Sequence, residues 1–203
     1  MPIPAFDLIS SVLPPHRGNP AEPADHSPYE CTVLEFCRHF ATSPERRAIL
    51  EGFLKLRQRL LSLNVTGFQW LDGSFLEDVE AHSGRAPRDI DIVTFISTPL
   101  GATDFDMLAV SNPWLLDHAH IKTTHRVDHF IVHLGWDPRG LINLSRYWYG
   151  LFSHRRDGTW KGMLCVELSN PSDDAGPLRP LELRYERSGI SQLSRGATRS
   201  TAS

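Results

Sequence analysis

The sequence predicts an α+β protein in which helices flank a small mixed β-sheet. Short runs of β-branched and aromatic residues are interspersed with amphipathic helical stretches, without the strict strand–helix–strand repeat of a doubly wound sheet. The chain has 203 residues, of which 40% are hydrophobic and 22% charged, values typical of one domain with its own core. We expect this domain to span residues 31–185, between a proline-rich irregular arm (1–30) and a flexible tail (186–203).

Composition argues against several classes of protein. No apolar run approaches the roughly 18 residues of a membrane-spanning helix, and no basic segment precedes a long apolar stretch at the N-terminus, so we expect neither a membrane protein nor a secretory signal. The net charge of −3 argues against a general nucleic-acid-binding surface. Cys31, Cys37 and Cys165 lack CxxC spacing. We therefore expect no disulfide framework, no cysteine zinc site and a cytoplasmic location.

Two helices are expected at the start of the domain. The segment 29–40 places apolar residues on one helical stripe. The second helix has a clear beginning, because Ser43 can cap it and Pro44 suits its first position. The basic residues of this second helix fall largely opposite its apolar face, and we expect them to be exposed to solvent. The stripe of the first helix consists of Val33, Leu34, Cys37 and Phe40.

The rest of the domain is expected to contain four strands and two helical regions. Its extended segments are rich in β-branched and aromatic residues, and the clearest of them alternates polar and apolar residues at period two. Pro113 should interrupt the first helical region, since proline restricts the residue before it. The expected strands cover 65–71, 89–95, 126–134 and 161–168, and the expected helices cover 103–120 and 141–152.

Three acidic residues on two of these strands are the main candidates for chemistry. Period-two geometry places Asp89 and Asp91 on one face of a strand, with Ile90 and Ile92 turned into the core. Like charges so close repel one another unless a divalent cation lies between them, and Mg²⁺ prefers carboxylate and phosphate oxygens. If the strand that carries Asp128 is adjacent, three carboxylates converge, as a site for two Mg²⁺ or Mn²⁺ ions requires.

The turn Gly73–Ser74, at the end of the preceding strand, provides the second half of the predicted site. Glycine allows a phosphate to approach the backbone closely, and the serine hydroxyl and exposed N–H groups can donate to its oxygens. Chemistry on a nucleoside triphosphate mainly requires positioning and neutralisation of charge. The turn and the carboxylates together therefore predict a site for an NTP or dNTP.

These motifs resemble the DNA polymerase beta-like nucleotidyltransferase superfamily. The pattern is a strand ending in Gly73–Ser74, then Asp89-x-Asp91 on the next strand, then a single Asp128, and it covers residues 64–135. The resemblance implies that superfamily's fold and the transfer of a nucleoside monophosphate to a hydroxyl, with release of pyrophosphate. It also implies that Asp89 and Asp91 bind both Mg²⁺ ions, that Asp128 binds the catalytic ion and helps to activate the hydroxyl, and that the Gly-Ser turn holds the triphosphate.

The resemblance leaves the acceptor open among a protein, a nucleic-acid end, a second nucleotide and a small molecule. Small stand-alone members of the superfamily include toxins, antibiotic-modifying enzymes and components of anti-phage defence, so a partner protein encoded in the same operon is a further candidate. One departure is the long segment between Gly73 and Asp89. We expect it to form a loop or short turn at the mouth of the site, which affects the placement of Ser74.

A cationic loop near residue 155 is a candidate for binding phosphate. Arg155, Arg156 and Lys161 could neutralise a triphosphate or a nucleic-acid backbone. The alternative is a hairpin tip with solvated arginines, because Asp157-Gly158 is a strong turn signal. Four aromatic residues before the loop could stack on a base, although such residues are more often part of the core. They are Tyr147, Trp148, Tyr149 and Phe152.

Three other interpretations remain open from the sequence. The first is a nucleotidyltransferase-like module that binds a partner protein or nucleic acid without turnover. The second is a metal-dependent glycosyltransferase, which also uses Asp-x-Asp, but the expected repeat of strands and helices before the motif is absent. The third concerns His129 and His133, whose spacing suits a zinc pair only on a helix, whereas this segment reads as a strand. We expect ordinary satisfied or exposed imidazoles there.

Overall fold

The computed structural model describes residues 3–99 and 101–169 of the chain. The expected tail (186–203) and the end of the expected domain (170–185) lie outside the described residues. Among the described residues, no helix is long and apolar enough to cross a membrane.

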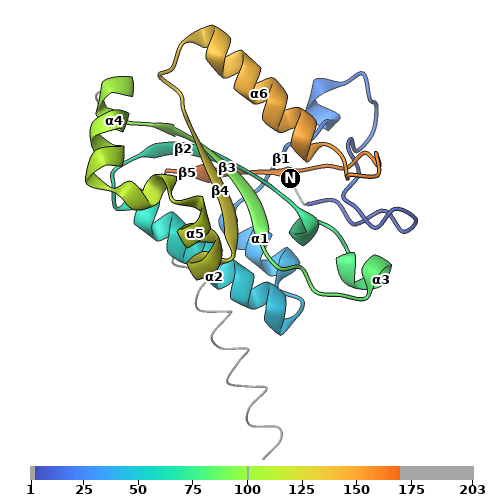
Figure 1. The fold of residues 1–203 in the computed structure, drawn as a ribbon. Coiled ribbons are helices and arrows are strands. Elements are labelled where there is room, and N and C mark those ends of the chain that lie inside the picture. Colours follow the sequence, from blue (N-terminus) through green and yellow to red (C-terminus); the bar gives the residue numbers. More distant parts are fainter. Residues whose placement is uncertain (1–2, 100, 170–203) are drawn as a thin grey trace, which may run out of the picture.

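A five-stranded mixed sheet lies at the centre of the fold, in the order β1-β5-β2-β3-β4 (Figure 1). β2 runs antiparallel to both of its neighbours, β3 and β5, whereas β3 is parallel to β4 and β1 is parallel to β5. This arrangement confirms the predicted α+β class. The strands are β1 (Tyr29–Glu30), β2 (Thr66–Asp72), β3 (Ile90–Ser97), β4 (Val127–His133) and β5 (Leu164–Leu168).

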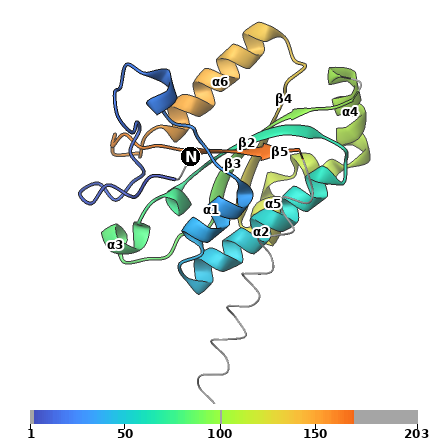
Figure 2. The ribbon, with the colours of Figure 1, turned by 180° about the vertical axis from the view of Figure 1, so that it is seen from behind.

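Helices cover both faces of the sheet, as the opposite views of Figures 1 and 2 show. On the face covered by α1, α2 and α5, Ile90 and Ile92 belong to the larger hydrophobic core. On the other face, Val93 packs with Trp148 and Phe152 of α6 in a second core. β3 is therefore apolar on both sides. The helices are α1 (Val33–Phe40), α2 (Pro44–Leu61), α3 (Val79–Ser83), α4 (Ala102–Ser111), α5 (His118–His125) and α6 (Pro138–Phe152).

The local signals at two helix boundaries are confirmed. Ser43 caps α2 by accepting a hydrogen bond from the backbone N–H of Arg46, and Pro44 occupies the first turn. Pro113 separates α4 from α5 and begins a short 3₁₀ helix, η3 (Pro113–Leu116). These three residues act through the backbone near them, so neighbouring sequence is sufficient to predict their effect.

The predicted beginning of the first helix is wrong. α1 begins at Val33, and Thr32 caps it in a reciprocal arrangement with Glu35. Tyr29 and Glu30 instead form β1, which pairs with β5. The strand partner lies far along the chain, so the local helical spacing did not reveal the pairing.

The expectation that the basic residues of α2 are exposed is wrong for Arg46 and Arg57, which are buried. Arg46 donates to Glu80 at 2.8 Å and to the carbonyls of Phe75 and Glu77. Arg57 donates to Gln69 of β2 at 2.7 Å. A guanidinium can be buried when its five N–H donors find acceptors. Arg57 therefore links α2 to the sheet, and Arg46 links α2 to the connection that follows β2.

The proline-rich arm is largely irregular, as expected, but it packs closely against the rest of the fold. Apart from β1, its described part contains one 3₁₀ helix, η1 (Pro23–Asp25). Val12 and Leu13 are buried. The backbone N–H of Asp78 donates to the carbonyl of Ser11, and that of Gly162 donates to the carbonyl of Leu13. The arm thus contacts both segments that flank the predicted site.

Candidate functional site

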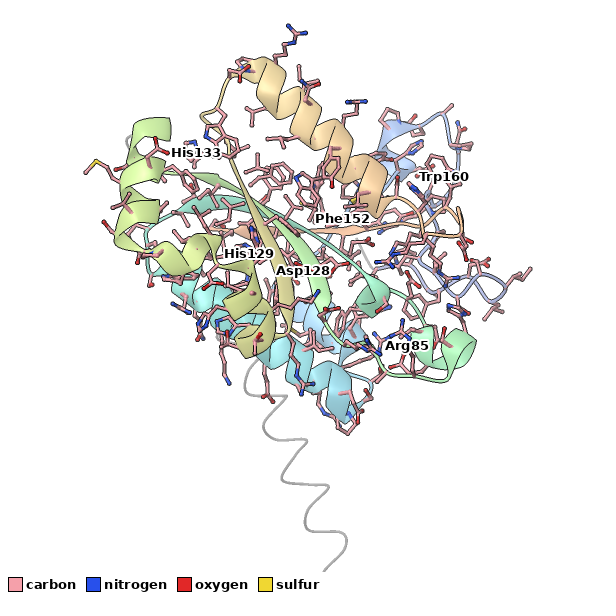
Figure 3. The ribbon with its side chains drawn as sticks, viewed as in Figure 1. Arg85, Asp128, His129, His133, Phe152 and Trp160 are labelled. Carbon is pink, nitrogen blue, oxygen red and sulfur yellow. The ribbon has the colours of Figure 1, made fainter. Side chains whose placement is uncertain are left out.

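The structure brings the three predicted carboxylates together at one end of the sheet. Asp89, Asp91 and Asp128 are called the acidic group below. β3 and β4 are parallel and in register, with Asp91 directly opposite Asp128. Their side chains share the face that carries Val93 and α6, because cross-strand partners point to the same side. Asp89 immediately precedes β3. Figure 3 shows Asp128 near the beginning of β4.

A lysine that the sequence analysis missed lies between two of these carboxylates. The ammonium of Lys122, on α5, is 2.9 Å from Oδ2 of Asp89 and 2.7 Å from Oδ2 of Asp128. No motif singles out this residue, because its role follows from the packing of α5 against β4. The pair Asp89 and Asp128 thus already converges on one cation.

Asp91 is the most perturbed member of the group. Burial, together with the negative charges of Asp89 and Asp128, raises the pKa of its carboxyl to about 6. Lys161 and Lys122 oppose this shift through their charges. A carboxyl with a raised pKa among like charges is typical of a functional site. Keeping such charges close together destabilises the fold, so their presence points to a use in function.

The predicted Gly73–Ser74 turn packs directly against Asp91. β2 ends at Asp72, Gly73 has φ +87°, and the 3₁₀ helix η2 (Ser74–Leu76) begins one residue later. A Cβ atom at Gly73 would lie 2.8 Å from Oδ2 of Asp91. Both the backbone conformation and the close approach therefore require glycine here. Ser74 is half-buried beside this contact.

Substituting Gly73 by alanine should damage the site more than its backbone strain explains. Gly101 has nearly the same backbone angles, but nothing lies within 4 Å of the Cβ that an alanine would add. We expect Gly73→Ala to reduce the free energy of unfolding by about 1–3 kcal/mol more than Gly101→Ala, because only the former collides with Asp91. Urea denaturation of both variants measures the difference, and equal losses would contradict this contact.

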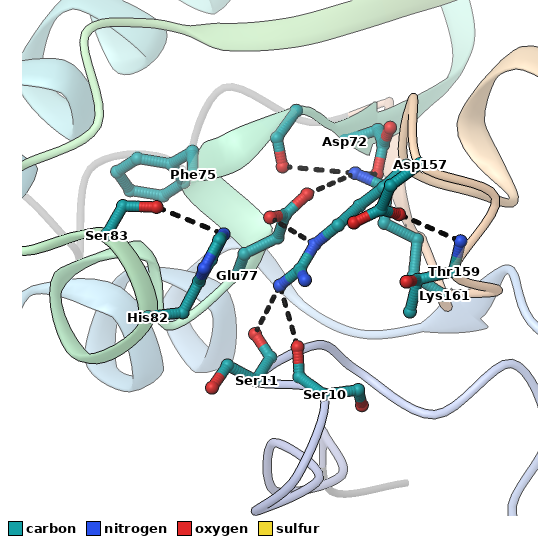
Figure 4. Close-up of polar contacts among 12 residues, drawn as sticks. Ser10, Ser11, Asp72, Phe75, Glu77, His82, Ser83, Asp157, Thr159 and Lys161 are labelled. Atoms are coloured by element: carbon teal, nitrogen blue, oxygen red, sulfur yellow. Dashed lines mark hydrogen bonds and ion pairs between the residues drawn. The ribbon is translucent and has the colours of Figure 1, made fainter.

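A second charged cluster lies behind the turn (Figure 4). The sequence analysis named its cations, Lys161 and Arg155, as candidates for binding phosphate but missed their carboxylate partners. The buried ammonium of Lys161 is 3.0 Å from Asp72 and 2.9 Å from Glu77, and 3.4 Å from the carbonyl of Gly73. Arg155 pairs with the other oxygen of Glu77 at 2.8 Å. The sequence contained a signal for Asp72: alternation along β2 places this carboxylate on the same face as Phe68 and Trp70, where an apolar residue would be expected.

The charges of Asp72 and Lys161 change each other's pKa values. Burial raises the pKa of Asp72 to about 7 even though the charge of Lys161 acts to lower it. For Lys161, burial acts to lower the pKa, but Asp72 and Glu77 outweigh it and the net shift is upward. The contact between Asp72 and Lys161 is an ion pair only, and Oδ1 of Asp72 has no hydrogen-bond partner among the described residues.

The cationic loop is a hairpin turn whose cations have different surroundings. The backbone N–H of Arg155 donates to Thr159 O at 2.9 Å and Gly158 has φ +87°, so the turn predicted at Asp157-Gly158 is confirmed. Arg155 also donates to the carbonyl of Ser10 in the arm. Arg156 is exposed. Lys161 and Arg155 would have to exchange carboxylate partners for phosphate in order to bind a nucleotide.

The four aromatic residues before the loop lie in three different surroundings: the core, the surface and the wall of a cavity. Trp148 and Phe152 are core residues, and Tyr147 is exposed. Tyr149 lines a cavity of about 410 Å³ together with Trp160 and Lys161. The remaining lining comes from the arm and from the end of α6: Pro15, His16, His26 and Ser153.

The histidines of β4 do not contribute to the acidic group. His129 is buried on the opposite face of β4 from Asp128, and its Nε2 lies 2.7 Å from the hydroxyl of Thr94 (Figure 3). Burial lowers its pKa to about 3. His133 is also buried and lies 3.1 Å from Thr98. The zinc-pair interpretation is not supported by this arrangement.

The donor chemistry of the acidic group fits Mg²⁺, but the present arrangement is that of a lysine-bound site. Three carboxylates supply the oxygen ligands that Mg²⁺ prefers, and Lys122 already holds a positive charge between two of them. In the described parts of the chain, no set of three or more His, Cys, Asp and Glu side chains is arranged to hold a metal ion. Metal binding would therefore require Lys122 to move away.

Comparison with known proteins identifies the family but no relative of known activity. Neither the curated proteins nor the solved structures contain a match to this chain. The sequence model of a family of unknown function, DUF6932, matches residues 4–167. This range includes every residue of the acidic group and of the cluster around Lys161, and on this match the chain belongs to the DUF6932 family.

Proposed function

We propose that the protein is a Mg²⁺-dependent nucleotidyltransferase with the polymerase beta-like fold, which transfers a nucleoside monophosphate from an NTP or dNTP to a hydroxyl. The observation that carries the proposal is the convergence of Asp89, Asp91 and Asp128, with the Gly73 turn in contact with Asp91. Sequence motifs predicted each part separately. Their meeting at one end of the sheet supports a common role.

Each residue has a distinct task in the proposed reaction. Asp89 and Asp91 would hold the metal ions, which when bound neutralise phosphate charge and polarise the reacting oxygens. The backbone of Gly73 and Ser74 would bind the triphosphate. Asp128 would help to hold the catalytic ion and would accept the proton of the acceptor hydroxyl. The acceptor oxygen bonds to the α-phosphorus, the bond from that phosphorus to the β-phosphate oxygen breaks, and pyrophosphate leaves with the electron pair.

Exposed cations on the segment before Asp89 and on the hairpin suit the approach of a nucleotide. Arg88 immediately precedes Asp89, and Arg85 lies at the end of the short α3 segment (Figure 3). This segment is the predicted insertion between the Gly-Ser turn and the Asp pair. Arg156 is a further exposed cation on the hairpin. Such side chains can pair with phosphate without first leaving a buried partner.

A second candidate is a nucleotidyltransferase-like module that binds a partner protein or nucleic acid without turnover. The ion pairs of Lys122 favour it, because they satisfy Asp89 and Asp128 within the chain itself. A degenerate site could keep its carboxylates if a lysine replaced the metal ion. The two candidates differ in whether the site turns over a nucleotide.

The test is incubation of the full-length protein with each NTP and each dNTP in the presence of Mg²⁺. We expect pyrophosphate release with at least one nucleotide and its loss on chelation of the metal. Intact-mass spectrometry of the protein, and gel analysis of added RNA and DNA, would identify the acceptor. Nucleotide binding without pyrophosphate release would instead support the silent module, and no nucleotide binding at all would contradict the proposed nucleotidyltransferase.

A further inference from the structure

The ammonium of Lys122 occupies the position between Asp89 and Asp128 where a metal ion would bind. It contacts Oδ2 of Asp89 and Oδ2 of Asp128 at 2.9 and 2.7 Å. Both carboxylates are fixed by the beginnings of adjacent parallel strands. Lys122, by contrast, is 48% exposed, and its flexible stem can swing into solvent without disturbing the core.

The same carboxylate oxygens cannot hold the lysine and a metal ion at once. Mg²⁺ binds carboxylate oxygens at about 2.0–2.1 Å, so an ion shared by Asp89 and Asp128 would occupy the space that the ammonium fills. The two positive charges would also repel each other strongly at that separation. Occupation by lysine and by metal are therefore alternative states of one site.

We propose that Lys122 is a built-in competitor of the divalent cation: it neutralises Asp89 and Asp128 when no metal is bound, and it must leave for the metal to bind. The inference rests on the proposed function only in taking these two carboxylates as metal ligands. It adds a regulatory property, because the strength of the lysine contacts sets the Mg²⁺ concentration at which the site is loaded. Nucleotide chemistry is not needed to observe it.

The test uses the full chain without nucleotide. Lys122→Met keeps the apolar stem and removes the charge. We expect it to bind Mg²⁺ about 3–30-fold more tightly than the natural chain, as measured by calorimetric titration of Mg²⁺ alone, because two partly exposed ion pairs no longer compete. We also expect the metal-free variant to melt about 2–5 °C lower, because Asp89 and Asp128 then lack their counter-ion.

Two control variants separate direct competition from a general change in charge. Arg88→Gln removes an exposed cation next to Asp89 and should change Mg²⁺ affinity less than about 2-fold, because a solvent-exposed charge is screened. Lys122→Arg keeps a cation in place and should preserve weak metal binding. An equal gain in Arg88→Gln and Lys122→Met would overturn the proposal.

The remaining outcomes distinguish this inference from the proposed function. Mg²⁺ binding by the natural chain with unchanged or weaker affinity in Lys122→Met would overturn the competitor role and leave the nucleotidyltransferase proposal standing. Binding only by Lys122→Met would support the competitor role and favour the silent module for the natural chain. Absence of Mg²⁺ and Mn²⁺ binding in all variants would overturn both.

Discussion

Replacing Asp91 by asparagine is expected to reduce nucleotidyl transfer by at least about 10³-fold, because a neutral amide replaces a charged ligand where transition-state charge is neutralised. The fold should persist. Asp91 is half-buried among like charges, and its burial together with these charges raises its pKa to about 6. An amide of the same shape removes this repulsion, so the free energy of unfolding at neutral pH should be unchanged or higher.

The measurement combines pyrophosphate release with urea denaturation on the same preparation. Asp106→Asn is the matched control, because Asp106 is an exposed carboxylate on α4, away from the acidic group. This control should keep turnover within about 2-fold of the natural chain. An Asp91→Asn protein that transfers nucleotide at the natural rate would end the proposed mechanism. An unfolded Asp91→Asn protein would contradict the charge argument.

Much of the acidic site could be predicted because its signals are local. Alternation along β3 places Asp91 opposite to Ile90 and Ile92 whatever the strand's neighbours are. Gly73 is marked as a turn by the break after an extended segment. The local pattern does not predict that β4 lies beside β3 in register, because that pairing depends on the packing of the whole sheet. The structure supplies this pairing of Asp91 with Asp128.

The parts that could not be predicted are those determined by distant residues. Arg46 and Arg57 look like ordinary solvated residues on α2, since their acceptors come from segments up to 110 positions away. Tyr29 and Glu30 form a strand only because β5 returns beside them. Lys161 gains Asp72 and Glu77 in the same way, and Lys122 gains Asp89, although its other partner, Asp128, is only six positions away. Charges whose counter-ions lie far along the chain read as surface residues when the sequence is considered alone.

Lys161→Met is expected to destabilise the protein by about 3–5 kcal/mol, the range for removing one partner from a buried ion pair. Lys161 is only 4% exposed and pairs with Asp72 and Glu77. Glu77 keeps Arg155 after the substitution, but Asp72 loses its ion-pair partner in a buried position. The predicted loss therefore arises mainly from Asp72, and urea denaturation at fixed pH measures it.

The pH dependence of this loss follows from the pKa of Asp72. Burial holds that pKa at about 7 even with Lys161 present, and without the lysine it should rise further. Between the ordinary value of 3.8 and this raised value, the folded state binds more protons than the unfolded state, so stability falls as pH rises. A protonated Asp72 needs no cation. Lys161→Met should thus be nearer to the natural chain at pH 6 than at pH 8.

A double variant shows whether Asp72 is the cause. Asp72→Asn in the Lys161→Met background removes the stranded charge, so it should recover at least about 1 kcal/mol at pH 8 and remove most of the pH dependence, as coupled neighbours do. Lys55→Met, at an exposed position of α2, is the control for loss of a lysine and should have little effect. Additive losses in the double variant would mean that Lys161 stabilises the fold through packing alone. In that case its ion pairs with Asp72 and Glu77 would not be the source of the stability that Lys161 contributes.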